Sequence, residues 1–364
     1  MNRKTVRTAA TTAAALTLAL GLTACGAANE GGEEPTGDSK LTGTLNSGGA
    51  SSQEAAVAAW KKAFQSANPD VTVNYDPVGS GGGREQFIAG GLDIAGSDAY
   101  LDDEELTKAK ERCSSDIVEV PTYVSPIAVI YNLDGVDELN LAPKTIGGIF
   151  EGTITSWNDA AIKADNPDAK LPATKITPVH RSDDSGTTEN FTDYLDQAAE
   201  GAWTGGKTKA WPVKGGEAAE GTSGVVAAVT NGKGTIGYAD ASQAGELGTA
   251  HVKVGDEFTE VSPEAAAKVL DASTQVEGRA ATDIAIDIDR KVTEAGVYPI
   301  VLVTYQIACQ SYDDKAKADL VKGWLSYVAS PEGQEAAATD AGSAPLSEAI
   351  AEKVKTAVDS ITAA

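Results

Sequence analysis

Side chains that bind metals or serve as nucleophile and base are scarce in this sequence. It has two His, at positions 180 and 251, three Cys and no Cys-x-x-Cys pair. Structural zinc sites need four such ligands, usually paired at short spacing, so a zinc centre is not expected. Neither His-x-x-x-His nor Gly-x-Ser-x-Gly occurs, which disfavours a phosphatase or other hydrolase. We therefore expect no catalytic residue, no metal and no cofactor.

Positive charge is also in short supply. The chain has 29 Lys and Arg against 53 Asp and Glu, a formal net charge of −24. Removing residues 1–24, which carry three basic and no acidic side chains, makes the net charge −27. So acidic a chain should not bind nucleic acid. If it binds an anion, the attraction must come from local donors.

Long apolar runs are confined to the N-terminus. Three basic residues, Arg3, Lys4 and Arg7, precede an uncharged stretch over 9–22, which has the length of a signal-peptide core and is short for a membrane span. The stretch ends in Leu22-Thr23-Ala24-Cys25, which resembles the lipobox of bacterial lipoproteins. That resemblance implies a lipoprotein signal peptide over 1–24 and lipidation of Cys25 through its sulfur. The alternative is a chance Cys after an ordinary signal peptide.

The segment that follows is polar and rich in Gly and Glu. Residues 25–40 contain no apolar cluster, so they cannot bury enough surface to offset the entropy of ordering them. We interpret them as a flexible acidic tether. It would hold a globular body at the outer face of the cell membrane, to which the exported chain is anchored by its lipid.

The remaining chain, about 325 residues, exceeds the usual size of a single core, so two domains are expected. Strand and helix patterns alternate along it, which favours an α/β architecture with mostly parallel strands. Strands are predicted at 41–46, 71–75, 92–95, 176–180 and 235–238, with long β-branched runs at 118–132 and 297–309. Helices are predicted at 54–66, 84–89, 101–111, 146–150, 157–164, 189–198, 225–230, 315–328 and 346–361.

Three segments between a predicted strand and a predicted helix share one composition. They are rich in Ser, Thr and Gly, and they lie at 47–54, 78–84 and 180–188. A helix start has unpaired N–H groups and a partial positive charge, and Gly lets an anion approach the backbone. Each segment can therefore hold an oxyanion, or can simply cap a helix, as Ser51 with Glu54 would do in a capping box. Only Arg84 and Arg181 add full positive charges within these segments.

A fourth segment, 91–99, ends a predicted strand with Asp98. The residue could merely form a turn before the helix at 101–111. In an anion site, however, a carboxylate repels its ligand unless the ligand carries a proton that the carboxylate can accept. Phosphate carries one near neutral pH and sulfate does not, so Asp98 would select phosphate.

At these four segments the chain resembles the periplasmic phosphate-binding protein of high-affinity ABC importers. The matching motifs are Gly-Gly-Ala-Ser-Ser at 48–52, Val-Gly-Ser-Gly-Gly-Gly at 78–83, Ala-Gly-Ser-Asp-Ala at 95–99 and Arg-Ser-Asp-Asp-Ser-Gly-Thr at 181–187. The resemblance covers about residues 41–350. It implies that phosphate is bound by Ser51, Ser52, Ser80, Asp98, Arg181, Ser185, Gly186 and Thr187.

The sequence departs from the family pattern at two of these positions. Ser51 stands where the family has Thr, which keeps the hydroxyl. Ser52 stands where the family has Phe, whose contact is through its backbone N–H, so Ser52 can still serve. Asp183 matches a family Asp that pairs with the ligand Arg, and would hold the Arg181 guanidinium in place.

The resemblance also implies a type II periplasmic-binding-protein fold, with two α/β lobes joined by two crossing strands and the ligand between them. The runs at 118–132 and 297–309 suit these crossings. Lobe 1 is then 41–125 plus 300–364, and lobe 2 is 126–299. Cys113 and Cys309 form a disulfide or stay as two buried free thiols; both fall beside the crossing runs in lobe 1, which makes the disulfide plausible.

The implied function is capture of inorganic phosphate outside the cytoplasm by a monomer, followed by delivery to the permease subunits of an ABC importer. Two alternatives remain open at this stage. One is a binding protein for another oxyanion such as sulfate or molybdate, which Asp98 disfavours. The other is a phosphate-sensing surface lipoprotein.

Overall fold

The computed structural model describes residues 41–364, so the signal peptide, the tether and the lipidation at Cys25 lie outside the described residues. The helices are α1 (Glu54–Ala67), α2 (Gly79–Ile88), α3 (Asp103–Cys113), α4 (Pro143–Glu151), α5 (Ala160–Asp165), α6 (Gly186–Ala198), α7 (Gly221–Asn231), α8 (Pro263–Ala272), α9 (Lys315–Val328), α10 (Pro331–Ala341) and α11 (Glu348–Asp359), with a 3₁₀ turn η1 (Ala241–Gln243). The sequence predicted neither α8 nor α10.

Nine strands form one sheet in the order β2-β1-β3-β14-β4-β8-β6-β7, with β9 paired to β4. The strands of the structure are β1 (Gly43–Gly49), β2 (Val71–Asp76), β3 (Ile94–Ser97), β4 (Ile117–Asn132), β5 (Asn140–Leu141), β6 (Thr177–Arg181), β7 (Glu217–Ala219), β8 (Thr235–Asp240), β9 (Gly248–Thr249), β10 (His251–Val254), β11 (Glu257–Thr259), β12 (Thr274–Gln275), β13 (Ile286–Asp287), β14 (Val301–Cys309), β15 (Ser311–Tyr312) and β16 (Thr362–Ala363).

The sheet is parallel toward its two ends and antiparallel in the middle. β1 runs parallel to β2 and β3, and β6 runs parallel to β7 and β8. In the middle, β14 is antiparallel to β3 and β4, and β4 is antiparallel to β8. The expectation of mostly parallel strands is therefore wrong for the centre, because the two connecting strands run in opposite directions where they pair.

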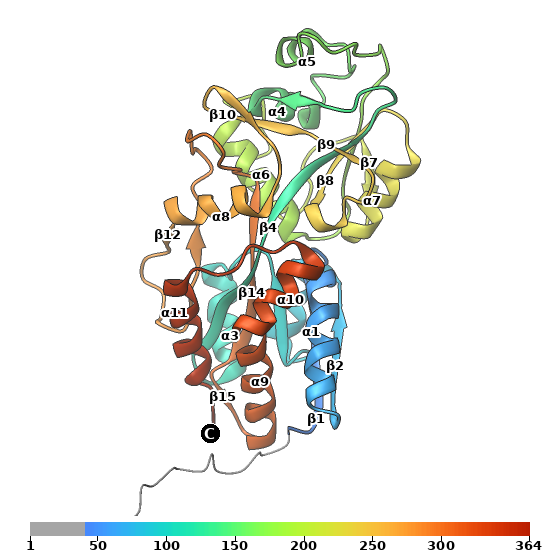
Figure 1. The fold of residues 1–364 in the computed structure, drawn as a ribbon. Coiled ribbons are helices and arrows are strands. Elements are labelled where there is room, and N and C mark those ends of the chain that lie inside the picture. Colours follow the sequence, from blue (N-terminus) through green and yellow to red (C-terminus); the bar gives the residue numbers. More distant parts are fainter. Residues whose placement is uncertain (1–40) are drawn as a thin grey trace, which may run out of the picture. The chain divides into compact units, whose positions relative to one another are not determined.

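Strand β4 is the longest element and belongs to both lobes. The run at 118–132 forms this single strand, in which 15 of 16 residues are buried. Its first half pairs with β14 from Ile117 opposite Cys309 to Pro126 opposite Val301, and its second half pairs with β8 from Ile127 to Asn132. Figure 1 shows β4 and β14 passing side by side between the two bodies of the molecule. β4 changes partner between Pro126 and Ile127, next to the predicted boundary at 125/126.

One stretch of the predicted lobe 2 hydrogen-bonds to lobe 1. Glu119 N donates to Thr282 O and Ile284 N donates to Glu119 O, while Ile286 N donates to Tyr305 Oη. Arg279 also donates to the carbonyl of Leu101. Residues 279–286 therefore run along the lobe 1 part of β4, although sequence position alone assigns them to lobe 2.

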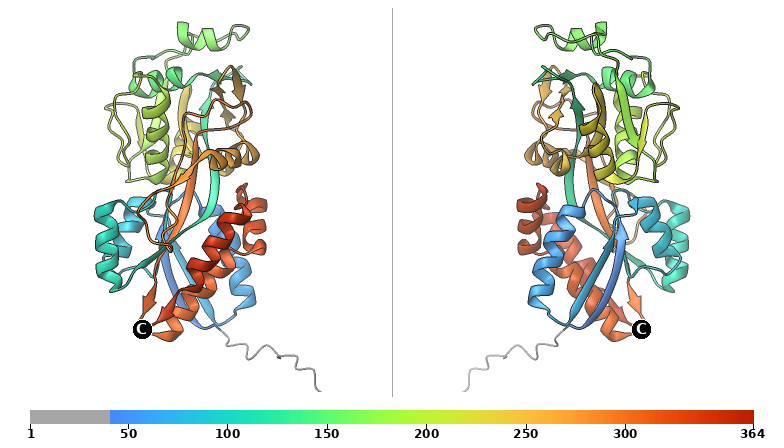
Figure 2. Two further views of the ribbon diagram at one scale, coloured as in Figure 1. Left: turned by 90° about the vertical axis from the view of Figure 1, so that its left-hand side faces the viewer. Right: turned by 90° about the vertical axis from the view of Figure 1, so that its right-hand side faces the viewer.

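Helices cover both faces of the sheet in lobe 1. Figure 2 shows α3 on one side of the strands and α1 with α9, α10 and α11 on the other. Trp60 of α1 is fully buried, and its indole N–H donates to Gly333 O of α10 over 2.7 Å. This packing leaves the carboxyl ends of β1 and β3, where Ser51 and Asp98 follow, directed toward lobe 2.

Cys113 at the end of α3 and Cys309 at the end of β14 form a disulfide across 196 residues of sequence. The bond ties α3 to the strand that returns from lobe 2. Within residues 41–364, every helix is too short or too polar to cross a membrane.

Candidate functional site

The eight predicted ligand residues come together between the two lobes. Lobe 1 contributes the turn before α1, the first turn of α2 and the residue after β3; lobe 2 contributes the segment from β6 into α6. All eight are buried: Ser51, Ser52, Ser80, Asp98, Arg181, Ser185, Gly186 and Thr187. The strand–turn–helix pattern of the sequence thus places every segment at the same junction.

Asp98 is the centre of this arrangement and is 2% exposed. Its Oδ1 accepts hydrogen bonds from Ser52 Oγ at 2.7 Å and Thr304 Oγ1 at 2.8 Å, and its Oδ2 accepts one from Thr187 Oγ1 at 3.0 Å. Its backbone N–H donates to Ser80 Oγ at 3.1 Å. The carboxylate therefore hydrogen-bonds to residues of both lobes, including one on a crossing strand. It does not cap α3, the helix that follows.

Burial raises the pKa of the Asp98 carboxyl above its ordinary value. The three hydroxyl hydrogen bonds and the charge of Arg181 favour the ionised form and offset part of this effect. A carboxylate with a raised pKa accepts a hydrogen bond from a protonated ligand more readily than an exposed Asp does.

Arg181 is 2% exposed and is held by Asp183 in a two-point pair. Nε donates to Asp183 Oδ1 at 2.7 Å, and Nη2 contacts Oδ2. Burial would raise the pKa of Asp183, but the hydrogen bonds and charge of Arg181 outweigh it and hold that pKa below its ordinary value. Among the described residues no hydrogen bond uses Nη1, so the pair orients the guanidinium and leaves this nitrogen for a ligand.

The start of α6 is packed tightly against lobe 1. Ser185 caps the helix by accepting a hydrogen bond from Thr188 N at 3.1 Å. A Cβ on Gly186 would lie 2.4 Å from Ser80 Oγ and 2.7 Å from the Cβ of Asp98. Only Gly fits here, because the helix N-terminus must approach the opposite lobe this closely.

The predicted capping box between Ser51 and Glu54 is wrong. The N-cap of α1 is Gln53, which makes no side-chain capping bond. Ser51 Oγ instead lies 3.1 Å from Thr222 Oγ1 and accepts a hydrogen bond from Thr222 N at 3.0 Å. The hydroxyl therefore faces lobe 2.

Sequence reasoning missed two residues of the site. Thr222 lies in Gly221-Thr222-Ser223-Gly224 at the start of α7, which has the same Gly, Ser and Thr composition as the three segments singled out. That signal could have been used. Thr304 lies inside the predicted β-branched run, where no local sequence pattern predicts that its hydroxyl would contact Asp98.

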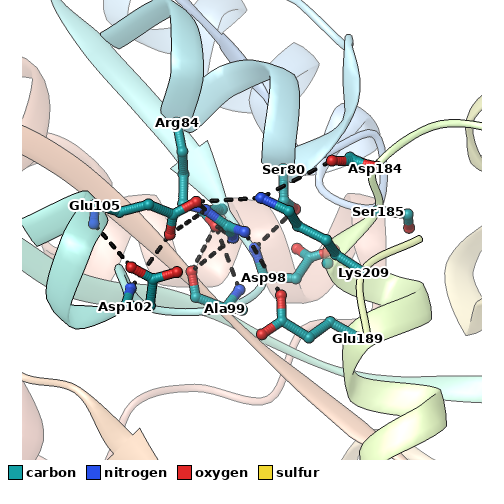
Figure 3. Close-up of polar contacts among 12 residues, drawn as sticks. Ser80, Arg84, Asp98, Ala99, Asp102, Glu105, Asp184, Ser185, Glu189 and Lys209 are labelled. Carbon is teal, nitrogen blue, oxygen red and sulfur yellow. Dashed lines mark hydrogen bonds and ion pairs between the residues drawn. The ribbon is translucent and has the colours of Figure 1, made fainter. Parts of the chain in front are cut away.

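Arg84, the other basic residue of the Gly-rich segments, is held by acidic and polar groups of the protein. Its Nε donates to Glu105 Oε1 at 3.1 Å and its Nη1 to Ser97 Oγ at 2.8 Å, while Nη2 lies 3.6 Å from Glu189 Oε2. Figure 3 shows the guanidinium between these two carboxylates. Arg84 therefore supports the lobe interface and is not placed to meet an anion beside Arg181.

Two further contacts join the lobes next to the site. Lys209 of lobe 2 lies 3.3 Å from Glu105 Oε1 of lobe 1 (Figure 3). Gly81 N at the start of α2 donates to Asp184 O at 3.0 Å. Together with Ser51 and Thr222, these contacts hold the two faces of the site against each other.

Comparisons with known proteins agree with this geometry. A profile of the PBP superfamily domain matches residues 34–332. The chain is 36% identical over 325 residues to phosphate-binding protein PstS 3 of Mycobacterium leprae, which covers 87% of each chain. The chain thus belongs to the PBP superfamily. Within it, the chain is a member of the family of PstS phosphate-binding proteins, which are extracytoplasmic solute-binding proteins.

Solved structures support the fold. The chain is similar to a high-affinity periplasmic phosphate-binding protein solved with bound phosphate, with a TM-score of 0.70, 22% identity and coverage of 86% of this chain and 93% of that one. A phosphate-binding protein from Stenotrophomonas maltophilia gives a TM-score of 0.68 and 23% identity, again with 86% and 93% coverage. The predicted type II periplasmic-binding-protein fold is confirmed.

Proposed function

We propose that this chain captures inorganic phosphate outside the cytoplasm and delivers it to the permease of an ABC importer. Family membership supports this, because the relatives are named as phosphate-binding proteins. The observation that carries the proposal is the buried Asp98 carboxylate, placed among hydroxyl groups, a helix N-terminus and Arg181. A site that combines these donors with one carboxylate acceptor favours a tetrahedral anion that carries a proton.

In this proposal the phosphate is bound by the eight residues at the junction of the lobes. Backbone N–H groups at the helix starts and the Nη1 of Arg181 bind the ligand oxygens, since these donors point where the lobes meet. Asp98 accepts the hydrogen of the phosphate. An ionised carboxylate facing sulfate would receive no hydrogen bond from the ligand and would repel it in a buried site, so the sulfate or molybdate alternative is disfavoured.

Binding is proposed to close the lobes about the crossing strands. The contacts between Ser51 and Thr222, Asp98 and Thr187, and Lys209 and Glu105 join opposite lobes, so they can form only when the lobes meet. We assign the described arrangement to the closed form. A hinge motion at the point where β4 stops pairing with β14 and begins to pair with β8 would break these contacts and release the ligand.

We further propose that a lipid on Cys25 anchors the mature chain to the outer face of the membrane, and that residues 25–40 act as its tether. Support comes from the lipobox-like sequence alone. Cys25→Ser should release the protein from the membrane fraction of cells that export it. Continued membrane retention of the variant would contradict the anchor without affecting the phosphate site.

The experiment that tests the function is a competition titration of the purified chain with phosphate, sulfate and arsenate. We expect phosphate to bind and sulfate to compete poorly at neutral pH. Absence of phosphate binding, or sulfate binding of equal strength, would contradict the proposal.

A further inference from the structure

The hydrogen bonds to Asp98 leave a limited number of free acceptor positions. A carboxylate has about two acceptor positions on each oxygen. Oδ1 accepts from Ser52 and from Thr304, so both of its positions are filled. Oδ2 accepts from Thr187, and among the described residues no other side chain donates to it. One acceptor position therefore remains, and it lies on Oδ2.

The hydroxyl groups around Asp98 are committed in the same way. Each hydroxyl has one hydrogen to donate, and Ser52, Thr187 and Thr304 each donate it to the carboxylate. Toward a ligand these three oxygens offer only lone pairs. The immediate surroundings of Oδ2 thus favour a ligand oxygen that carries a hydrogen and repel one that does not.

Thr304 is well placed to fix this arrangement. It lies in β14, is fully buried, and occupies the point where the pairing of β14 with β4 shifts register between Thr304 and Tyr305. Tyr305 pairs with Ser97, the residue before Asp98. A bulge at this point turns the strand locally, and the Thr304 hydroxyl reaches Oδ1 from the crossing strand.

We propose that Thr304 is a positioning residue that determines specificity. Thr304 and Ser52 together occupy both acceptor positions of Oδ1. The carboxylate can then accept one hydrogen bond from the bound anion, at the remaining position on Oδ2. This rests on the proposed function and deepens it: the preferred ligand class is a tetrahedral oxyanion that donates one hydrogen bond, and the selection depends on a residue outside the predicted ligand set.

The test compares Thr304→Val with Thr304→Ser in the full chain, by titration with phosphate and with sulfate. Val keeps the shape and removes the hydroxyl, so an acceptor position on Oδ1 opens and the carboxylate is less firmly ionised. We expect phosphate affinity and the preference for phosphate over sulfate each to fall on the order of tenfold. Ser restores the donor and should return both quantities to about the wild-type values.

Thr122→Val is the matched control. Thr122 is a fully buried Thr of the neighbouring crossing strand, and its hydroxyl contacts the Thr304 carbonyl at 3.4 Å without touching Asp98. It should leave the preference for phosphate over sulfate unchanged. If Thr304→Val does not fold, Ser52→Ala removes the other donor to Oδ1 and should lower the same preference.

The outcomes separate the two proposals. Wild-type protein that fails to bind phosphate contradicts the proposed function. Wild-type protein that binds phosphate selectively, with the same selectivity in Thr304→Val, overturns the role of Thr304 alone. Equal losses in Thr304→Val and Thr304→Ser would also overturn it, because the hydroxyl would then be irrelevant.

Discussion

Arg84 and Arg181 are equally buried, at 2% exposure each, yet they have different surroundings. Arg181 is bound by one carboxylate and keeps Nη1 free of protein partners among the described residues. Arg84 lies between Glu105 and Glu189 and also donates to Ser97. Burial alone would lower the pKa of Arg84, but these carboxylates outweigh it and raise that pKa. The comparison teaches that burial and charge do not identify a ligand residue, whereas unused donors do.

The largest effect on ligand binding is expected from Arg181→Ala. It removes a charged donor from the ligand and leaves Asp183 unpaired, so phosphate affinity should fall by on the order of 2–4 kcal/mol. Titration calorimetry measures this directly. Unchanged affinity would place the anion elsewhere and remove the contrast between the two arginines.

Arg84→Gln should lower the stability of the fold more than it lowers phosphate affinity. It leaves the mostly buried Glu189 without its nearest cation and Glu105 with Lys209 alone, so the free energy of unfolding should fall by about 2–3 kcal/mol. Phosphate affinity should change less than in Arg181→Ala. Chemical denaturation and titration of both variants give the comparison, and a larger affinity loss for Arg84→Gln would reverse our assignment of roles.

Asp98→Asn tests the contribution of the carboxylate to the preference for phosphate over sulfate. The amide donates where the carboxylate accepted, so phosphate should lose about 1–2 kcal/mol of its advantage over sulfate. In the wild type, burial raises the pKa of Asp98, so as the pH falls Asp98 is protonated before an exposed Asp would be. Protonated Asp98 can donate to sulfate, and sulfate affinity should therefore rise as pH falls. Titrations across pH should show this trend in the wild type and not in Asp98→Asn.

The smallest effect is expected at Lys209, which is part of the same interface as Arg84. Lys209→Met removes a partly exposed pair with Glu105, worth roughly 0.5–1 kcal/mol and weakened by salt. Phosphate should dissociate a few-fold faster at low ionic strength, and the difference should disappear at high salt. Lys144→Met, which loses a 2.7 Å pair with Glu200 inside lobe 2, is the control for stopped-flow measurements.

Local sequence patterns predicted the elements that build the site better than they predicted the periphery. The Ser- and Gly-rich segments at 47–54, 78–84 and 180–188 do lie at strand-to-helix junctions, because Gly and helix-start chemistry are local properties. Helix α2 begins earlier than predicted, at Gly79, since packing against lobe 2 overrides the low helix propensity of its glycines. Helices α8 and α10 were missed although each begins with Pro after an N-cap Ser, a recognisable start signal.

The sequence could not reveal contacts between distant positions. Asp98 and Thr304 are 206 residues apart, and Ser51 and Thr222 are 171 apart. Thr304 reaches Asp98 because β14 pairs with β3 in the sheet, and Ser51 reaches Thr222 only where the two lobes come into contact. A run of buried apolar residues also looks the same whether it forms one strand or two, and only the sheet pairing makes 117–132 a single strand.

The disulfide between Cys113 and Cys309 has a consequence for the integrity of the whole molecule. Residues 126–299 lie entirely inside the covalent ring that this bond closes. A protease that cuts once anywhere in that ring would leave both fragments linked. Such a nicked protein should migrate as one species in electrophoresis without reductant and as two with it, so a cut in lobe 2 need not detach that lobe from the rest of the chain.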